Sequence, residues 1–140
     1  MKSGIKKIAI GALLTISTGV WAEVSVITHP SNGASFDAKT VAKIFLGKSK
    51  KFPGGGSAVP IDQAEGSAGR DEFHANVTRK KSAQLKSYWS RIVFTGKGQP
   101  PKEVASDTEV MALIAKNPNM IGYVNSSSVN GSVKVILTAP

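Results

Sequence analysis

The sequence predicts an α/β protein, a small sandwich in which helices flank a largely parallel or mixed β-sheet. Segments rich in β-branched residues alternate along the chain with segments whose apolar residues recur at helical spacing. The 140 residues correspond to one domain, because domains usually have about 100–200 residues. Hydrophobic residues make up 41% and charged residues 19% of the chain, so enough apolar side chains are present to form a core. The sequence contains no internal repeat and no second domain.

Residues 1–22 have the features of a secretory signal peptide, which the mature protein is expected to lack. They comprise three lysines near the start, an apolar run over residues 8–20 and a small residue, Ala22, at the end. The run is shorter than the ~20 residues of a comfortable membrane span, so a retained membrane anchor is the less favoured alternative. We expect a bacterial periplasmic protein with residues 23–140 as its domain. Without those three lysines, 15 of the 18 basic residues remain against 9 acidic residues, so the formal net charge of the domain is +6.

The first predicted strand and helix lie in residues 23–47. Residues 23–28 alternate and are β-branched, which predicts a strand, and the proline and glycine of residues 29–33 end it. Asp37 is a suitable N-cap for a helix whose apolar residues follow at i, i+3 and i+4: Val41, Ile44 and Phe45. Gly47 is expected to end this helix.

A second strand and two helices are predicted next. Residues 48–57 form a basic, glycine-rich turn, and the short apolar segment 58–61 indicates a buried strand. The tight turn 66–69 precedes a helical pattern from about Arg70, with apolar residues four apart at Phe73 and Val77. A stronger helix begins at Ser82, and its apolar face is expected in the core rather than against a ligand: Leu85, Tyr88, Trp89 and Ile92.

The C-terminal part is predicted as a loop, a helix and two strands. The loop covers residues 95–101, and residues 106–109 form a capping box. The core face of the helix follows: Val110, Met111 and Ile114. Residues 117–119 end the helix, and residues 120–124 and 132–137 indicate the two strands.

Cysteine and histidine usage excludes several kinds of site. The chain has no cysteine, which rules out a disulfide framework, a thiol nucleophile and a cysteine-ligated zinc site. Its two histidines, His29 and His74, are too few for a histidine-rich metal site, and we expect neither metal nor cofactor. Asp71, Glu72 and His74 are close in sequence, but adjacent positions on a helix point in different directions. We therefore expect no enzymatic activity.

The basic residues do not indicate nucleic-acid binding. Aromatic residues make up 6% of the chain and do not alternate with the lysines, so no stacking platform for bases is predicted. The lysine and arginine clusters at residues 48–51 and 79–81 are interpreted as solvated loop and helix-end residues.

The best candidate binding site is the segment 63–70, between a predicted strand and a predicted helix. The first turn of a helix has free amides and a partial positive charge, which favour phosphate-like anions. Ser67 offers a hydroxyl and Arg70 a forked cation. The predicted oxyanion ligands are Gln63, Gly66, Ser67, Ala68, Gly69 and Arg70. The alternative is ordinary helix capping, for which serine and glycine are also typical.

Four stretches of the sequence carry a family resemblance through their order and spacing: residues 41–48, 65–73, 95–101, and 105–107 with 117–124. They resemble the phosphate-binding family of periplasmic solute-binding proteins, the receptors of phosphate ABC transporters. The resemblance implies a single-lobe, type II periplasmic-binding-protein-like α/β fold with a mixed sheet and flanking helices. It also implies binding of phosphate without chemistry.

Two departures from the family pattern concern the ligand. Family members resemble one another in an Arg-x-x-Gly-Ser-Gly-Thr run that holds phosphate, and here Gly66 and Ser67 match its first glycine and its serine. The neutral Gln63 stands at the arginine position, and Ala68-Gly69 replaces the final Gly-Thr. Full-length receptors also have two lobes, whereas this chain is similar to a compact, single-lobe subgroup.

The expected function is therefore that of an exported domain that binds phosphate or a similar oxyanion for ABC-type uptake or sensing. An ABC permease or another envelope protein would be its partner, and a homodimer would pair two half-sites. The alternative is a non-transport periplasmic interaction or assembly module that has lost ligand binding. A hydrolase would need a nucleophile and a base within reach, and the sequence offers no such pair.

Overall fold

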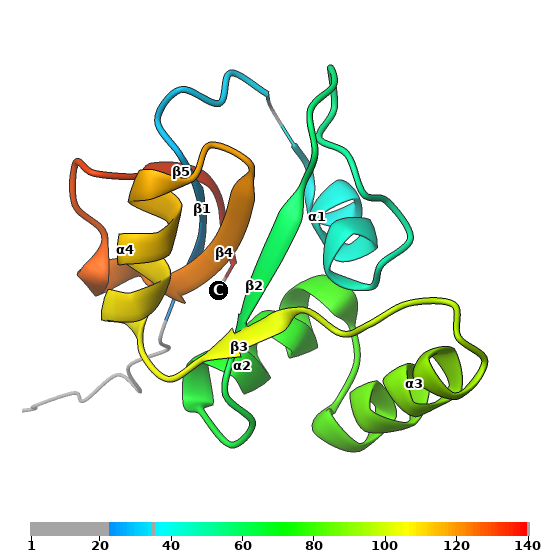
Figure 1. Ribbon diagram of the computed structural model, residues 1–140. Helices are drawn as coiled ribbons and strands as arrows, with labels where there is room; N and C mark the ends of the chain where they lie inside the picture. The colour runs from blue at the N-terminus through cyan, green and yellow to red at the C-terminus, as the bar shows by residue number, and fades with distance from the viewer. Residues whose placement is uncertain (1–22, 35, 140) are drawn as a thin grey trace, which may run out of the picture.

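A computed structural model describes residues 23–34 and 36–139, so the predicted signal segment 1–22 lies outside the described residues. The elements in chain order are β1 (Val24–Thr28), α1 (Ala38–Phe45), β2 (Val59–Gln63), α2 (Ala68–Phe73), the π-helical turn η1 (His74–Thr78), α3 (Ser82–Phe94), β3 (Lys102–Val104), α4 (Asp107–Lys116), β4 (Met120–Asn125), the 3₁₀ turn η2 (Ser126–Ser128) and β5 (Lys134–Ala139). Strands and helices alternate along most of the chain (Figure 1).

The strands form one five-stranded mixed sheet in the order β3-β2-β4-β1-β5. β2 pairs in parallel with both β3 and β4. β1 pairs antiparallel with β4 and with β5. The predicted α/β class with a mixed sheet and flanking helices is therefore confirmed.

Helices cover both faces of this sheet (Figure 1). α1, α2 and η1 pack on one face, where Val26, Phe45 and Phe73 belong to the same core cluster. α4 packs on the other face, and its Val110 and Ile114 contact the cluster that contains Ile27. All five residues of β1 are buried because successive side chains point to opposite, equally covered faces.

Caps start and end the helices where the sequence predicts them, but of the predicted capping box at residues 106–109 the structure shows only the bond that Ser106 accepts. The Asp37 carboxylate accepts a hydrogen bond from the amide of Thr40 at 2.9 Å, and Ser106 caps α4 through the amide of Glu109 at 3.2 Å. Gly47 follows α1 with a φ of +74°, a conformation that glycine adopts without strain.

The structure corrects several predicted boundaries. β2 continues to Gln63, and α2 starts at Ala68 rather than at about Arg70. β3 has no counterpart among the predicted strands, because three residues are too few to show a period-two pattern. It exists because its backbone pairs in parallel with the end of β2. The predicted helical pattern continues through Val77, and the structure makes its second part, η1, π-helical rather than α-helical.

The apolar face of α3 is less buried than predicted. Leu85 is buried, but Tyr88, Trp89 and Ile92 are only partly buried. Figure 1 shows the reason, because α3 lies out beyond the sheet beside the end of α1. Tyr88 donates its hydroxyl hydrogen to the Leu46 carbonyl and so ties α3 to that end.

No helix in the described part of the chain is long and apolar enough to cross a bilayer.

Candidate functional site

The predicted oxyanion segment lies at the carboxyl end of β2 and in the first turn of α2. Gly66 makes the turn between them with a φ of +94°, which disfavours any residue with a Cβ. Ser67 is the N-cap of α2, and its hydroxyl accepts a hydrogen bond from the amide of Arg70 at 3.1 Å. Ala68 and Gly69 precede the i to i−4 hydrogen-bonding pattern, so their amides point outward from the helix start. The structure therefore shows Ser67 in its capping role, at a helix start where the first amides have no acceptor within the helix.

The side chain of Gln63 is occupied within the fold. Its Nε2 donates to the Asp107 carboxylate at 2.7 Å and to the Tyr123 carbonyl at 3.0 Å, which uses both amide hydrogens. Gln63 is 5% exposed, and its Oε1 lies under Gly69, where a Cβ would come within 3.3 Å of it. Gln63 thus links β2 to α4 and β4, and no hydrogen of its amide remains for a ligand.

The Asp107 carboxylate is the hydrogen-bond acceptor for the side chain of Gln63. The same carboxylate also accepts hydrogen bonds from the backbone amide of Asn125 at 3.1 Å and from the hydroxyl of Ser128 at 2.8 Å. Asp107 is also the first residue of α4, where the helix dipole stabilises a negative charge. Negative charge at this position opposes an anion at the neighbouring α2 turn.

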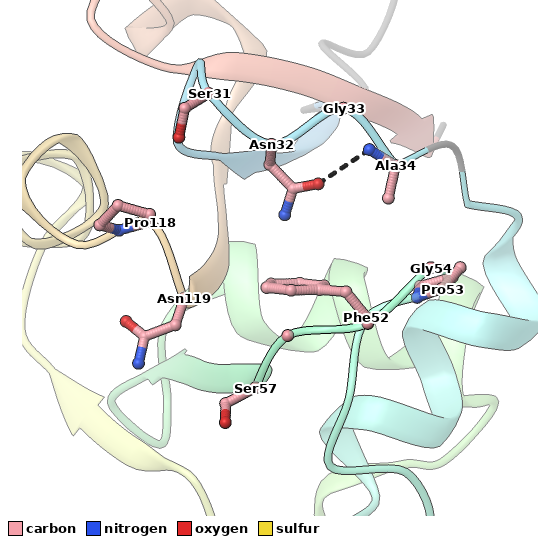
Figure 2. Close-up of a pocket in the computed structure, with 12 residues that line it drawn as sticks. Ser31, Asn32, Gly33, Ala34, Phe52, Pro53, Gly54, Ser57, Pro118 and Asn119 are labelled. Atoms are coloured by element: carbon pink, nitrogen blue, oxygen red, sulfur yellow. Dashed lines mark hydrogen bonds between the residues drawn. The ribbon is translucent and has the colours of Figure 1, made fainter.

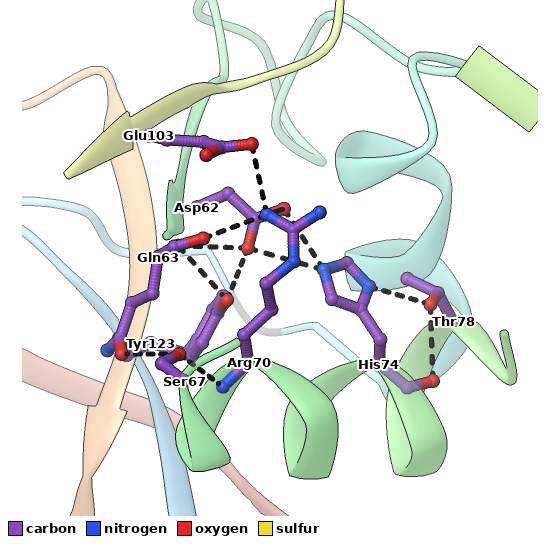
Figure 3. A network of polar contacts seen from close by, with 8 residues as sticks. All are labelled: Asp62, Gln63, Ser67, Arg70, His74, Thr78, Glu103 and Tyr123. Carbon is purple, nitrogen blue, oxygen red and sulfur yellow. Dashed lines mark hydrogen bonds and ion pairs between the residues drawn. The ribbon is translucent and has the colours of Figure 1, made fainter. Parts of the chain in front are cut away.

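The guanidinium of Arg70 points toward the sheet, away from Ser67 (Figure 3). Its Nη1 donates to the Gln63 carbonyl at 2.8 Å and to the Glu103 carboxylate at 3.2 Å. The same nitrogen lies 3.6 Å from Asp62 Oδ2. Two carboxylates therefore offset the charge of Arg70.

Asp62 is the centre of a buried polar network (Figure 3). His74 Nε2 lies 3.0 Å and 3.3 Å from its two carboxylate oxygens, and Tyr123 donates its hydroxyl hydrogen to Oδ1. His74 Nδ1 lies 2.8 Å from the hydroxyl of Thr78. The network joins η1, β2 and β4 and involves residues that are at most 6% exposed.

The network shifts the ionisation of two of its members. Burial alone would raise the pKa of Asp62, but the hydrogen bond and charge of His74, the Tyr123 hydroxyl and the charge of Arg70 together hold that pKa below its usual value. Burial raises the pKa of Tyr123, and the negative charge of Asp62 raises it further. Asp62 is therefore a carboxylate at neutral pH, and Tyr123 is a neutral donor to it.

Sequence reasoning missed Asp62 and Tyr123. A carboxylate in the short, otherwise buried strand Val59–Gln63 is the signal that could have revealed the network.

The sequence argument that Asp71, Glu72 and His74 do not converge agrees with the geometry. Asp71 is exposed, the Glu72 carboxylate accepts from Asn76 at 3.0 Å, and His74 turns to β2. Within residues 23–34 and 36–139, no group of three acidic or histidine side chains could hold a metal ion.

A cavity of about 590 Å³ lies at the opposite end of the sheet from the α2 turn. It is formed by the loop after β1, the glycine-rich loop around Phe52, and Pro118-Asn119 before β4. Figure 2 shows Asn32 and Phe52 on its two sides, with the side-chain Oδ1 of Asn32 accepting a hydrogen bond from the backbone amide of Ala34. The predicted oxyanion residues do not line this cavity.

No protein-family model and no curated protein sequence matches this chain. Solved structures do. A Clostridium perfringens protein described as a phosphate ABC transporter substrate-binding protein, with bound phosphate, is 25% identical, with a TM-score of 0.64 over 82% of this chain and 45% of its own. An ABC-type phosphate transport receptor from Vibrio cholerae is 17% identical, with a TM-score of 0.64 over 82% of this chain and 46% of its own. PstS from Borrelia burgdorferi is 16% identical, with a TM-score of 0.60 and coverages of 82% and 47%.

The chain thus spans less than half the length of each of these structures. Its sheet and flanking helices match one lobe of PstS-type periplasmic binding proteins. The proteins that it resembles are named as binding proteins or receptors.

Proposed function

We propose that this chain is an exported solute-binding-protein-like domain that binds phosphate or a similar oxyanion at the first turn of α2. Residues 1–22 would direct it to the periplasm, and its role would be ABC-type uptake or sensing. The amides of Ala68 and Gly69 would hold the anion oxygens, together with the hydroxyl of Ser67. No chemistry would be performed on the ligand.

The observation that carries this proposal is the exposed helix start after Gly66. Its outward amides and the positive end of the α2 dipole lie at the carboxyl end of β2. The likeness to a structure with bound phosphate, at 25% identity, supports the same ligand class.

Gln63 and Arg70 have smaller roles in this proposal than the sequence predicts. Gln63 would support the turn from below, because its amide hydrogens already have acceptors. Arg70 would contribute a partly offset charge through the protein rather than a direct fork. Each missing charge-assisted hydrogen bond weakens binding by about 1.5–3 kcal/mol, so we expect affinity weaker than micromolar for a single copy.

The second candidate function is a non-transport interaction or assembly module without a small ligand. The carboxylate of Asp107 favours it, because Asp107 occupies the amide of Gln63 and opposes a nearby anion. Its partner would then be another envelope protein.

Isothermal titration calorimetry distinguishes the two candidates. Phosphate is titrated, with sulfate in parallel, into the protein from Glu23 onward, which contains all five strands and both core clusters. The matched variants are Ser67→Asn and Ser67→Asp, because both side chains cap a helix equally well and differ in charge.

The oxyanion proposal predicts saturable phosphate binding. Ser67→Asn should retain this binding within about threefold, because the NH2 group of asparagine replaces the hydroxyl as the donor to the anion. Ser67→Asp should weaken it at least about tenfold, because a carboxylate has no such donor and repels the anion. Gln63→Arg, which restores the arginine of the family pattern beside Asp107, is expected to strengthen binding. Absence of heat with both the natural protein and Gln63→Arg up to millimolar phosphate would refute the proposal and leave the interaction module.

A further inference from the structure

A separate cavity of about 370 Å³ lies between the end of α1, α3 and the amino ends of β2 and β3. None of residues 63–70 lines it, so it is independent of the proposed oxyanion site. Its volume is within the range of pockets that hold small organic ligands, about 300–1,000 Å³.

The walls of this cavity are mainly apolar. Ile44 and Phe45, each 1% exposed, lie on the α1 side, and Ala58 is also buried. The other walls come from separate segments and include Pro60, Pro100, Pro101 and Trp89. Aromatic rings and prolines in these walls favour a flat apolar group in van der Waals contact with them.

Trp89 is held in place before any ligand arrives. Its indole lies against Gly47, where a Cβ would come within 3.1 Å of the ring, so a larger residue would displace the indole. Tyr88 packs edge-on to it, with ring centroids 5.2 Å apart and an interplanar angle of 84°. The Tyr88 hydroxyl is in turn bonded to the Leu46 carbonyl. A preorganised aromatic wall reduces the entropy lost on binding.

The rim of the cavity is positively charged. Lys50 and Lys102 both line it and are exposed, and no aspartate or glutamate is among its lining residues. Neither lysine forms an ion pair with a residue in the described part of the chain. Two uncompensated ammonium groups beside an apolar space repel a cation and attract an anion.

We propose that this cavity is a binding site for a small organic anion with a flat apolar body, of the aromatic carboxylate class. The ring enters between Trp89 and the α1 side of the cavity, and the carboxylate stays at the rim near Lys50 and Lys102. Inorganic phosphate does not fit this chemistry, because it has no apolar surface to bury against the walls.

The test uses benzoate, its uncharged isostere benzamide and inorganic phosphate as probes. Trp89 is the only tryptophan from residue 23 onward, so a change in its emission reports binding beside it. Trp89 also lines a neighbouring cavity that includes Glu65 and Arg70, so the variants described next decide which of the two cavities binds the probe. We expect a saturable change in emission with benzoate, about tenfold weaker binding of benzamide, and no change with phosphate. Equal binding of benzoate and benzamide, or no saturable change with benzoate, would overturn the proposal.

Variants locate the site. Lys50→Gln with Lys102→Gln is expected to weaken benzoate binding about tenfold, since each lost ion pair at an exposed site accounts for up to about fivefold. The matched control is Lys39→Gln with Lys116→Gln, which removes two exposed lysines from elsewhere and should leave affinity unchanged.

Val59→Phe fills the cavity with a larger side chain and should abolish benzoate binding. Because Val59 is 37% exposed, the substitution does not crowd the core, and we expect an unchanged melting temperature. Benzoate binding that survives both Val59→Phe and the Lys50 and Lys102 changes would place the site elsewhere and refute the assignment. This outcome is independent of phosphate binding at α2.

Discussion

Replacing Asp62 by asparagine tests the buried network that joins η1 to the sheet. The substitution keeps the size of the side chain but removes the charge that faces His74, Tyr123 and Arg70. Loss of one partner from a buried ion pair costs about 3–5 kcal/mol. Arg70 keeps its contacts with Glu103 and the Gln63 carbonyl, so we expect the lower end, about 3 kcal/mol of unfolding free energy at pH 7.

The same network predicts the acid dependence of stability. The folded pKa of Asp62 lies below its unfolded value, so the unfolded chain binds the proton more readily. The contribution of Asp62 is therefore complete above the unfolded pKa of about 3.9 and is lost as the pH falls through the lower, folded pKa. The difference in stability between the natural protein and Asp62→Asn should shrink over that interval.

Urea unfolding followed by far-ultraviolet circular dichroism measures both effects, at pH 7 and at steps down to pH 3. Asp71→Asn is the control, because Asp71 is an exposed aspartate on α2, and this substitution should change the unfolding free energy by no more than about 0.5 kcal/mol. A loss of less than about 1 kcal/mol for Asp62→Asn at pH 7, or a difference that does not decrease in acid, would refute this account of the network.

Three further predictions concern stability. Gly122→Ala should destabilise the fold by about 1–3 kcal/mol, which calorimetry would show as a melting temperature lowered by several degrees. The added Cβ would lie 2.8 Å from Val110 and 2.9 Å from Ile114, and an unchanged melting temperature would mean that α4 shifts outward freely. Gly66→Ala should cost about 1–2 kcal/mol in urea unfolding through its φ of +94°, and a neutral result would show that the turn can adopt another conformation. Phe94→Ser should change the unfolding free energy by no more than about 0.5 kcal/mol, because Phe94 is 91% exposed, and a larger loss would indicate that Phe94 is covered in solution.

The local features of the fold could be predicted from the sequence. The cap at Asp37, the cap at Ser106 and the end of α1 at Gly47 each depend on residues within a few positions, and the structure has all three. The alternation of strand and helix patterns also sufficed for the α/β class, because side-chain periodicity reflects which face of an element is buried. The first turn of α2 was found in the same way, from glycine and serine before a helix.

The partners of the polar side chains were decided by the tertiary structure alone. Gln63 gives its amide hydrogens to Asp107 and Tyr123, which are distant in sequence, and Arg70 reaches Glu103 on a strand too short for a sequence pattern. α3 shows the same limit for apolar contacts, because its predicted apolar face is only partly buried where α3 lies out beyond the sheet. Periodicity specifies which face of an element is apolar, whereas the group that meets that face depends on how distant segments pack.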